Sequence, residues 1–411
     1  MVRFRAVLVL IAALGSTTLL GSTTLLGAVP AAAQPGCSRQ VAPPPPVDSS
    51  EAPAPGVPAA PPLPVPDPPV GGPRMGECGL VLPAGAPAPP AGISSMSWLI
   101  ADADSGEVLA ADDPHARNRP ASTLKLLTAL LAADQLPPDR VVVGTRDDAD
   151  QDGSRVGIGP GGRYTVRQLL TGLFLASGND AAHALAVALG GVAQTVKQMN
   201  ELAAKLGALD TRAATPSGLD GPGMSASAYD LALAFRQVLN RPLLVELLGT
   251  RQADFPGYGD RPGFVVNNDN TLLRTYPGAL GGKTGFTDDA RHTQLDAARR
   301  GGRRLMVVLM RGEQRPVSMS EQAARLLDYG FTLPSGSPVG RLVDEAEPPE
   351  AAETGPGLTP GALPAPPDAG AHATAQSSTS RAHEAGVALW IGLAVTVLAV
   401  LGSLAARRRH R

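Results

Sequence analysis

Residues 120–125 read Pro120-Ala121-Ser122-Thr123-Leu124-Lys125 and lead into an apolar run over residues 126–131. This run predicts a helix that begins near Ala121, just after the proline. A serine and a lysine three positions apart share one face of a helix, so the nitrogen of Lys125 can reach the hydroxyl of Ser122. The amino end of a helix also favours the negative charge of a developing alkoxide. The stretch therefore predicts a nucleophile, Ser122, with a lysine as its base.

Two further triplets follow: Ser177-Gly178-Asn179 about 50 residues later, and Lys283-Thr284-Gly285 about 100 residues after that. The first triplet lies between two predicted helices and places a hydroxyl and an amide on a tight turn. The second lies on a predicted strand, where glycine lets a ligand approach the backbone closely. There Lys283 would attract a carboxylate and Thr284 would donate a hydrogen bond to it.

Each motif alone is common and has an ordinary structural explanation. The first also fits a helix-capping serine with a solvated lysine, the second an ordinary loop before a helix, and the third a lysine on an edge strand. All three in this order are typical of a serine acyl-transfer site that uses lysine as its base. Lysine acts as a base only when burial or a neighbouring cation lowers its pKa. Lys283 is the candidate for that cation.

The surrounding sequence predicts an α+β fold. Residues 97–101 and 107–110 form a hairpin around an Asp-Ser-Gly turn, and strands return at residues 278–285, 292–298 and 305–310. Helices fill the middle at residues 166–175, with Thr165 as N-cap, and at 180–189, 193–206 and 226–239, and a last helix spans 318–329. We expect one antiparallel sheet built from both ends of the domain, covered by helices, with a helical subdomain.

With Pro120-Ala121 before the first motif, Asp180-Ala181 after the second and Phe286-Thr287-Asp288 after the third, residues 93–335 resemble the D-alanyl-D-alanine carboxypeptidases. These are the low-molecular-mass penicillin-binding proteins of the serine DD-peptidase family. The resemblance implies a β-lactamase/transpeptidase-like fold, removal of the terminal D-alanine from peptidoglycan stem peptides, and inhibition by β-lactam antibiotics. It implies no metal or cofactor.

The resemblance also implies roles for single residues. Ser122 is the nucleophile, Lys125 the base and Ser177 the relay that returns the proton to the departing D-alanine. The backbone N–H groups of Ser122 and Phe286 form the oxyanion hole. The substrate-binding residues are Asn179, Lys283, Thr284, Gly285 and Phe286. The charged stretch 288–292 departs from the family pattern and leaves the fine substrate preference open.

The ends of the chain predict export and anchoring. Residues 1–33 read as a signal peptide, with an apolar run and a small-residue cleavage site. Residues 387–406 carry no charge and are long enough to cross a bilayer, and the arginine-rich tail 407–411 would stay in the cytoplasm. We therefore expect a single-pass protein of the cell membrane with an extracytoplasmic catalytic domain at residues 93–335.

Two Pro/Ala-rich stretches flank that domain. Residues 34–92 are predicted to be an extended linker that cannot bury a core, and residues 336–386 a disordered linker to the membrane helix. Cys37 and Cys78 are the two cysteines of the chain, and in an exported protein we favour a disulfide between them over free thiols. A net charge of −2 with 3% aromatic residues argues against a nucleic-acid partner.

Several alternatives stay open. A class A-type β-lactamase shares the motifs but needs a glutamate for deacylation, and the two glutamates between the second and third motifs are Glu201 and Glu246, both in helical patterns. A wall-binding module without activity is a second rival. The acidic residues 148–153 resemble the start of a calcium loop, although Gly159 stands where that loop needs glutamate. His183 or His292 could serve a Ser-His site.

Overall fold

The computed structural model describes residues 37–345 of the 411-residue chain. Within this range seven strands form one antiparallel sheet in the order β1-β3-β2-β10-β9-β8, and β11 also pairs with β3. Strands from the two ends of the domain meet where β2 pairs with β10, which confirms the predicted assembly. The strands are β1 (Leu80–Val81), β2 (Ser97–Asp102), β3 (Glu107–Asp112), β8 (Ala279–Thr287), β9 (Arg291–Arg300), β10 (Arg303–Gly312) and β11 (Gly340–Arg341).

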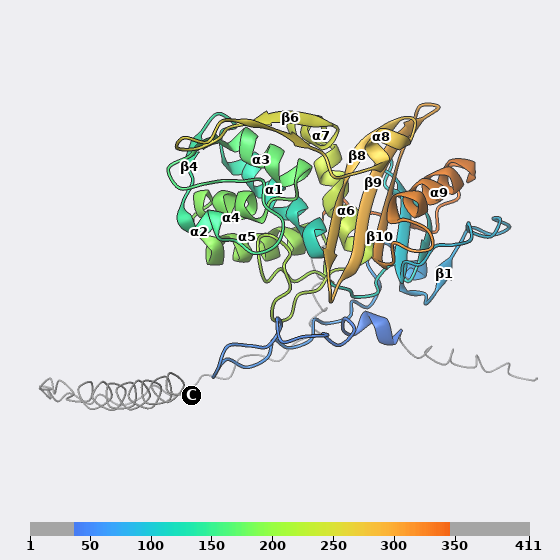
Figure 1. Ribbon diagram of the computed structural model, residues 1–411. Helices are drawn as coiled ribbons and strands as arrows, with labels where there is room; N and C mark the ends of the chain where they lie inside the picture. Colours follow the sequence, from blue (N-terminus) through green and yellow to red (C-terminus); the bar gives the residue numbers. More distant parts are fainter. Residues whose placement is uncertain (1–36, 346–411) are drawn as a thin grey trace, which may run out of the picture. The chain divides into compact units, whose positions relative to one another are not determined.

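The central strands are buried on both faces. Along β10, Leu305, Val307 and Leu309 pack into one apolar cluster, whereas the residues between them pack into another, because successive side chains of a strand point to opposite faces. Helix α9 (Met319–Thr332) covers the first face and α6 (Ala228–Leu239) covers the second. The sheet is therefore the middle layer between helices, as Figure 1 shows.

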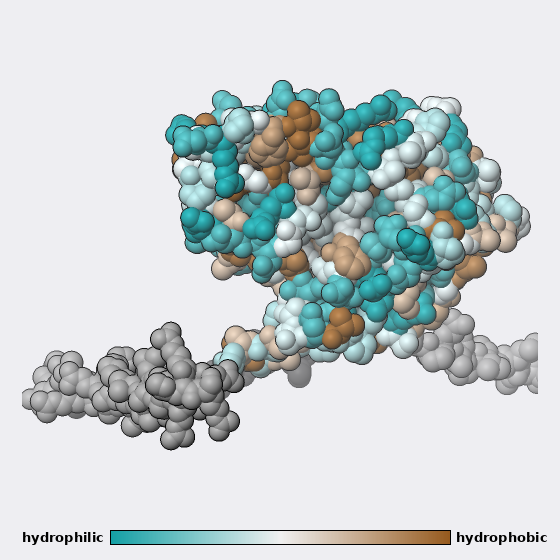
Figure 2. All heavy atoms as spheres, in the orientation of Figure 1, coloured by the Kyte–Doolittle hydropathy of each residue, from teal (hydrophilic) through white to brown (hydrophobic). Residues whose placement is uncertain are grey.

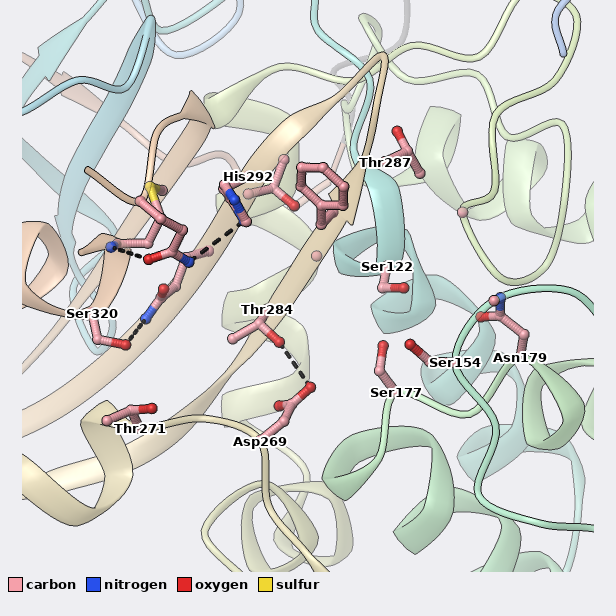
Figure 3. Close-up of a pocket in the computed structure, with 18 of the residues that line it drawn as sticks. Ser122, Ser154, Ser177, Asn179, Asp269, Thr271, Thr284, Thr287, His292 and Ser320 are labelled. Carbon is pink, nitrogen blue, oxygen red and sulfur yellow. Dashed lines mark hydrogen bonds between the residues drawn. The ribbon is translucent and has the colours of Figure 1, made fainter. Parts of the chain in front are cut away.

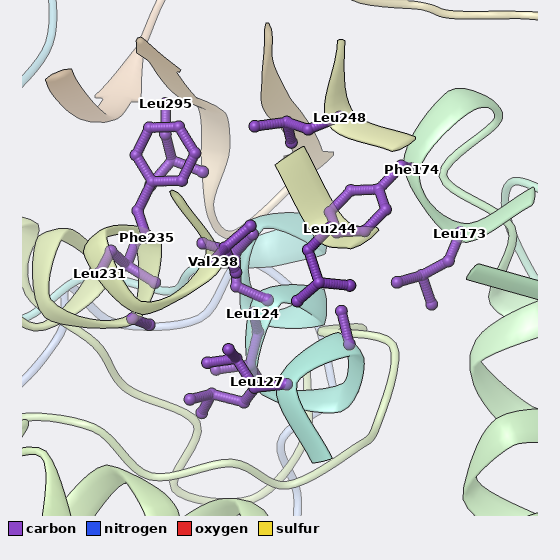
Figure 4. Packing of buried hydrophobic residues seen from close by; sticks show 14 of the residues in the cluster. Leu124, Leu127, Leu173, Phe174, Leu231, Phe235, Val238, Leu244, Leu248 and Leu295 are labelled. Carbon is purple, nitrogen blue, oxygen red and sulfur yellow. The ribbon is translucent and has the colours of Figure 1, made fainter. Parts of the chain in front are cut away.

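A helical half lies beside the sheet (Figure 1). Its core gathers leucine and phenylalanine side chains from α1, α3, α6 and α7 against Leu295 of β9 (Figure 4). Two small two-stranded sheets, β4–β5 and β6–β7, border this half. The elements are α1 (Lys125–Gln135), α2 (Arg146–Ala149), α3 (Val166–Leu175), α4 (Asn179–Ala188), α5 (Val192–Lys205), α7 (Pro242–Leu248), α8 (Leu272–Thr275), β4 (Val141–Val143), β5 (Arg163–Thr165), β6 (Gln252–Phe255) and β7 (Phe264–Asn267).

The predicted helices and strands are present, and Thr165 caps α3 in a reciprocal pair of bonds with Gln168. The boundaries shift by a few residues, and the largest shift at the site is that α1 begins at Lys125, because Ala121–Leu124 form a 3-10 turn. The sequence patterns missed α7, the small helices α2 and α8, both two-stranded sheets and the short strands β1 and β11. The face of the domain seen in Figure 2 is mostly hydrophilic, with hydrophobic groups in small separate areas.

Residues 37–92 pack against the domain, which corrects the prediction that this stretch buries no core. The segment is mostly without regular secondary structure, as its proline content predicts. However, the side chains of Met75 and Val81 are fully buried, and β1 pairs with β3. Cys37 and Cys78 form a disulfide, which confirms the predicted pairing.

Two buried arginines hold this segment, and we call residues 37–82 the arm. Arg117 donates hydrogen bonds to the backbone oxygens of Val41, Leu63 and Pro64. Arg119 bonds both the carboxylate of Glu51 and the backbone oxygen of Pro44. These bonds satisfy carbonyl groups that an extended chain cannot pair within itself. The arm is ordered by the domain rather than by its own sequence.

The domain also continues past residue 335. Val339 and Leu342 are buried and β11 pairs with β3, so the predicted disordered linker does not begin at residue 336. Among the described residues, no helix is long and apolar enough to span a membrane. The predicted signal peptide at 1–33 and the predicted membrane helix at 387–406 lie outside the described residues.

Candidate active site

A cavity of about 720 Å³ opens between the helical half and the edge strand β8. Figure 3 shows Ser122, Ser177 and Asn179 on its helical side and Thr284 on its strand side. Lys125 and Lys283 lie behind this lining, with fully buried side chains. The predicted site residues that line the cavity are Ser122, Ser177, Asn179, Thr284, Gly285 and Phe286.

Lys125 and Ser122 are hydrogen-bond partners. The distance from Lys125 Nζ to Ser122 Oγ is 2.7 Å. Lys125 Nζ also donates to Asn179 Oδ1 at 2.6 Å and to the backbone oxygen of Ser217 at 2.7 Å. A neutral amine has two N–H groups for those acceptors and one lone pair for the hydroxyl proton. The geometry therefore suits an uncharged lysine that takes a proton from serine.

The surroundings of Lys125 favour that uncharged form. Burial lowers the pKa of the Lys125 ammonium group well below its ordinary value, and the nearby charge of Lys283 lowers it further. The charges of Asp269 and Asp180 act in the opposite direction but do not reverse the shift. Lys283 thus has the electrostatic effect predicted from the sequence, and both burial and this charge favour the neutral amine that a base requires.

The backbone around Ser122 is tightly constrained. Ala121 adopts a left-handed conformation with φ of 48°, which is uncommon for a residue with a side chain. A Cβ on Gly218 would come within 1.9 Å of the Ala121 oxygen, and a Cβ on Gly285 within 2.9 Å of the Ser122 nitrogen. Both glycines are needed because their backbones press against the turn that carries the nucleophile.

The second motif joins Ser122 and Lys125 to the loop of residues 152–158, on the same side of the cavity. Ser177 also has positive φ, at 55°, and Asn179 is the first residue of α4. Asn179 donates through Nδ2 to the backbone oxygen of Asp152 at 2.6 Å. The carboxylate of Asp180 accepts three backbone N–H groups of residues 156–158. Together these two residues fix the loop that carries Ser154 into the cavity.

The third motif lies on β8. Lys283 donates to the backbone oxygen of Thr284 at 2.7 Å, and burial lowers the pKa of Lys283. The hydroxyl of Thr284 donates to Asp269 Oδ2 at 3.0 Å (Figure 3). Thr284 therefore faces the cavity. Lys283 lies behind the lining, where its positive charge can attract an anion in the cavity.

Sequence patterns missed three participants: the Ser217 oxygen, the Asp152 oxygen and the Asp269 carboxylate. Backbone acceptors have no sequence signature, because every residue carries one. Asp269 lies between two buried asparagines, Asn268 and Asn270. That Asn-Asp-Asn stretch shortly before β8 was the available signal for a rigid turn.

The histidine and calcium alternatives find no support among the described residues. Ser122 has Lys125 as its partner, and His183 instead bonds Asp148 at 2.6 Å. Asp148 also accepts from the backbone and hydroxyl of Thr145, so it is a helix-capping residue of α2. His292 lines the cavity but stacks on Phe286, with ring centroids 4.5 Å apart.

One described cluster, His115, Asp210 and Asp230, has residue types that bind metals. Both nitrogens of His115 are already occupied, by Asp210 at 2.7 Å and by the Val70 oxygen at 3.0 Å. Arg117 lies 3.0 Å from the other oxygen of Asp210 and supplies the positive charge. We interpret the cluster as an internal ion network that supports the arm.

A known family shares this arrangement. The sequence profile of the D-alanyl-D-alanine carboxypeptidase family, peptidase family S11, matches residues 84–314. The chain belongs to this family. The D-alanyl-D-alanine carboxypeptidase DacB2 of Mycobacterium tuberculosis is 46% identical over 266 residues, which cover 64% of this chain and 90% of that one. DacF of Bacillus subtilis is 31% identical and aligns over 58% of this chain and 62% of its own length.

Solved structures agree with this family assignment. The D-alanyl-D-alanine carboxypeptidase of M. tuberculosis superposes with a TM-score of 0.62 at 45% identity, covering 64% of this chain and all of that one. Penicillin-binding protein 6B of Escherichia coli gives a TM-score of 0.54 at 34% identity, over 60% of this chain and 80% of that one. The α+β fold of the DD-peptidases is thus established for this carboxypeptidase-family chain.

Proposed function

We propose that the protein is a serine-type carboxypeptidase that removes the terminal D-alanine from peptidoglycan stem peptides, and that β-lactams acylate the same serine. The observation that carries the proposal is the pair of Ser122 and Lys125, whose reacting atoms lie 2.7 Å apart. Burial and Lys283 lower the pKa of Lys125, which favours the neutral amine that can accept the serine proton. Family membership supplies the substrate class.

In the acylation step, Lys125 takes the hydroxyl proton while Ser122 Oγ attacks the carbonyl carbon between the two D-alanines. The C–N bond then breaks, and Ser177 passes the proton to the departing amine. The backbone N–H groups of Ser122 and Phe286 would stabilise the oxyanion. The close approach of Gly285 to the Ser122 nitrogen supports this placement of the two donors.

Substrate contacts come from the rest of the lining. Thr284 would donate to the terminal carboxylate, with the charge of Lys283 behind it, and Gly285 leaves room for the peptide. Asn179 would bind the peptide backbone as well as orient Lys125. Water then adds to the acyl carbon, and the shortened peptide leaves as an acid.

A β-lactamase would need a group that activates water rapidly. Glu201 and Glu246 pair with Lys197 and Arg167, and their side chains are 60% and 59% exposed. Neither lines the cavity, and the lining of the described chain includes no glutamate. This composition favours slow hydrolysis of the acyl-enzyme that penicillin forms on Ser122.

The test is intact mass of the protein after addition of benzylpenicillin, followed over time beside Ser122→Ala. A persistent adduct on the wild type alone, together with release of D-alanine from a D-Ala-D-Ala peptide, supports the proposal. A transient adduct with consumption of the drug would indicate a β-lactamase. No adduct and no D-alanine, with peptide binding retained, would indicate a wall-binding module.

We propose further that the enzyme acts outside the cell, tethered by residues 387–406. The signal-peptide pattern supports export, and the disulfide between Cys37 and Cys78 fits an oxidising compartment. Fractionation of cells should recover the protein with membranes after alkaline carbonate washing. Deletion of residues 387–411 should release it, and recovery in the soluble fraction without that deletion would contradict the tether.

A further inference from the structure

The cavity proposed to receive a carboxylate contains a carboxylate of its own. Asp269 is the one acidic residue among the cavity-lining residues of the described chain, and no lysine or arginine lines the cavity with it. The two lysines of the site are fully buried behind the lining. An anionic ligand that reaches Thr284 therefore meets Asp269 first and the positive charges only through intervening atoms.

Asp269 is also held rigidly in this position. Its backbone N–H donates to the oxygen of Leu175 at the end of α3, at 2.9 Å. On one side, the buried Asn268 donates to the oxygen of Thr250 at 2.9 Å. On the other side, the buried Asn270 donates to Asp296 Oδ1 at 2.7 Å. The turn cannot easily swing Asp269 out of the cavity, because hydrogen bonds to three other parts of the chain hold residues 268–270.

The contact between Asp269 and Thr284 creates a competition. The hydroxyl of Thr284 has one proton and donates it to Asp269 Oδ2. A ligand carboxylate that accepts the hydrogen bond of Thr284 must replace Asp269 as the acceptor. The two negative groups then lie close together. Their repulsion at a partly exposed site is worth about one factor of ten in affinity or more.

We propose that Asp269 is a specificity-determining residue that competes with the ligand's carboxylate for the Thr284 hydroxyl and weakens the hold of the site on small anionic ligands. This inference rests on the proposed function, because it takes Thr284 as the carboxylate donor. Its consequence is that binding depends on the rest of the stem peptide more than on the terminal carboxylate. Anionic ligands without that peptide, such as penicillins, acylate Ser122 more slowly than the remainder of the site would allow.

The experiment compares acylation of Ser122 by benzylpenicillin, which is anionic, with acylation by its methyl ester, which is neutral. Second-order rate constants come from intact mass for the wild type and Asp269→Asn. Asp269→Glu keeps the charge, and Asp288→Asn is the matched control, because Asp288 is an exposed acidic residue outside the cavity lining. Each protein is measured at low and at high ionic strength.

We expect Asp269→Asn to raise the rate constant with benzylpenicillin about tenfold at low ionic strength, with a smaller gain in high salt. The rates are compared on the plateau of the pH profile, where the effect of the Asp269 charge on the pKa of Lys125 no longer changes them. There the ester should react unchanged, Asp269→Glu should keep the wild-type ratio of the two rate constants, and Asp288→Asn should match the wild type. Equal gains with both ligands, a loss, or no change for Asp269→Asn would overturn the inference while leaving the proposed function intact. A wild type that forms no adduct on Ser122 would overturn the proposed function and this inference with it.

Discussion

The active-site cavity and the contact between the arm and the domain both bury basic side chains, but only the second region gives them a counter-ion. Lys125 has only neutral acceptors, and the nearest charge that lowers its pKa is another cation. Arg117 and Arg119, a few residues earlier, each meet a carboxylate, Asp210 and Glu51. Burying a cation without a counter-ion costs free energy of folding, and such groups are typical of functional sites. A buried cation that is paired with a carboxylate instead holds two parts of the structure together.

The sharpest way to test this contrast is Lys125→Met. Acylation by benzylpenicillin should fall by about a thousandfold or more, because the general base is lost. The free energy of unfolding should change little, since an unpaired buried amine is replaced by an apolar chain of similar length. Intact-mass kinetics and thermal unfolding measure the two effects, and a large loss of stability would remove the contrast.

Arg117→Met should give the reverse pattern. We expect the free energy of unfolding to fall by about 3–5 kcal/mol, because the buried Asp210 keeps only His115 as a partner and three backbone oxygens of the arm lose their donor. Acylation by the folded protein should stay within a few-fold of the wild type. Arg74→Met is the control, because the pair of Arg74 and Glu77 is 43% and 42% exposed and should be worth under about 1 kcal/mol. Chemical denaturation measures all three proteins.

The disulfide gives a smaller and purely structural effect. It closes a loop with a sequence separation of 41 residues, so Cys37→Ser should cost about 2–4 kcal/mol of unfolding free energy. The double variant Cys37→Ser/Cys78→Ser should cost no more than the single one. Acylation of Ser122 measured well below the melting temperature should be unaffected, and a loss there would mean that the arm takes part in the chemistry.

The last test concerns the pKa of Lys125, which is measured by the position of the pH profile and not by the height of the rate, because Lys283 would also attract the carboxylate of the ligand. Since the charge of Lys283 lowers the pKa of Lys125, Lys283→Met should raise that pKa. The rising limb of the acylation rate against pH should then shift to higher pH, because the neutral amine forms later. Lys205→Met, which removes an exposed lysine, should leave the limb in place. An unshifted limb in Lys283→Met would mean that Lys283 does not tune the base.

The sequence predicted the part of the molecule in which residue type and local spacing carry the information. Ser122 and Lys125 share a turn, so a motif suffices to place them together, and the apolar run at residues 305–310 suffices to predict a strand. The arm was misjudged because its docking depends on Arg117 and Arg119, which lie far away in the sequence. Asp269 was missed because its partner Thr284 is on another element.

The arm precedes in the chain every surface that receives it. Strand β3, Arg117, Arg119 and Asp210 all follow residue 82, so during synthesis and export the arm emerges before its partners exist. Proline cannot continue a helix or donate to a sheet ladder, so the waiting segment forms no competing structure and offers no strand edge for aggregation. The composition of the arm thus suits a segment that is made first and put in place last.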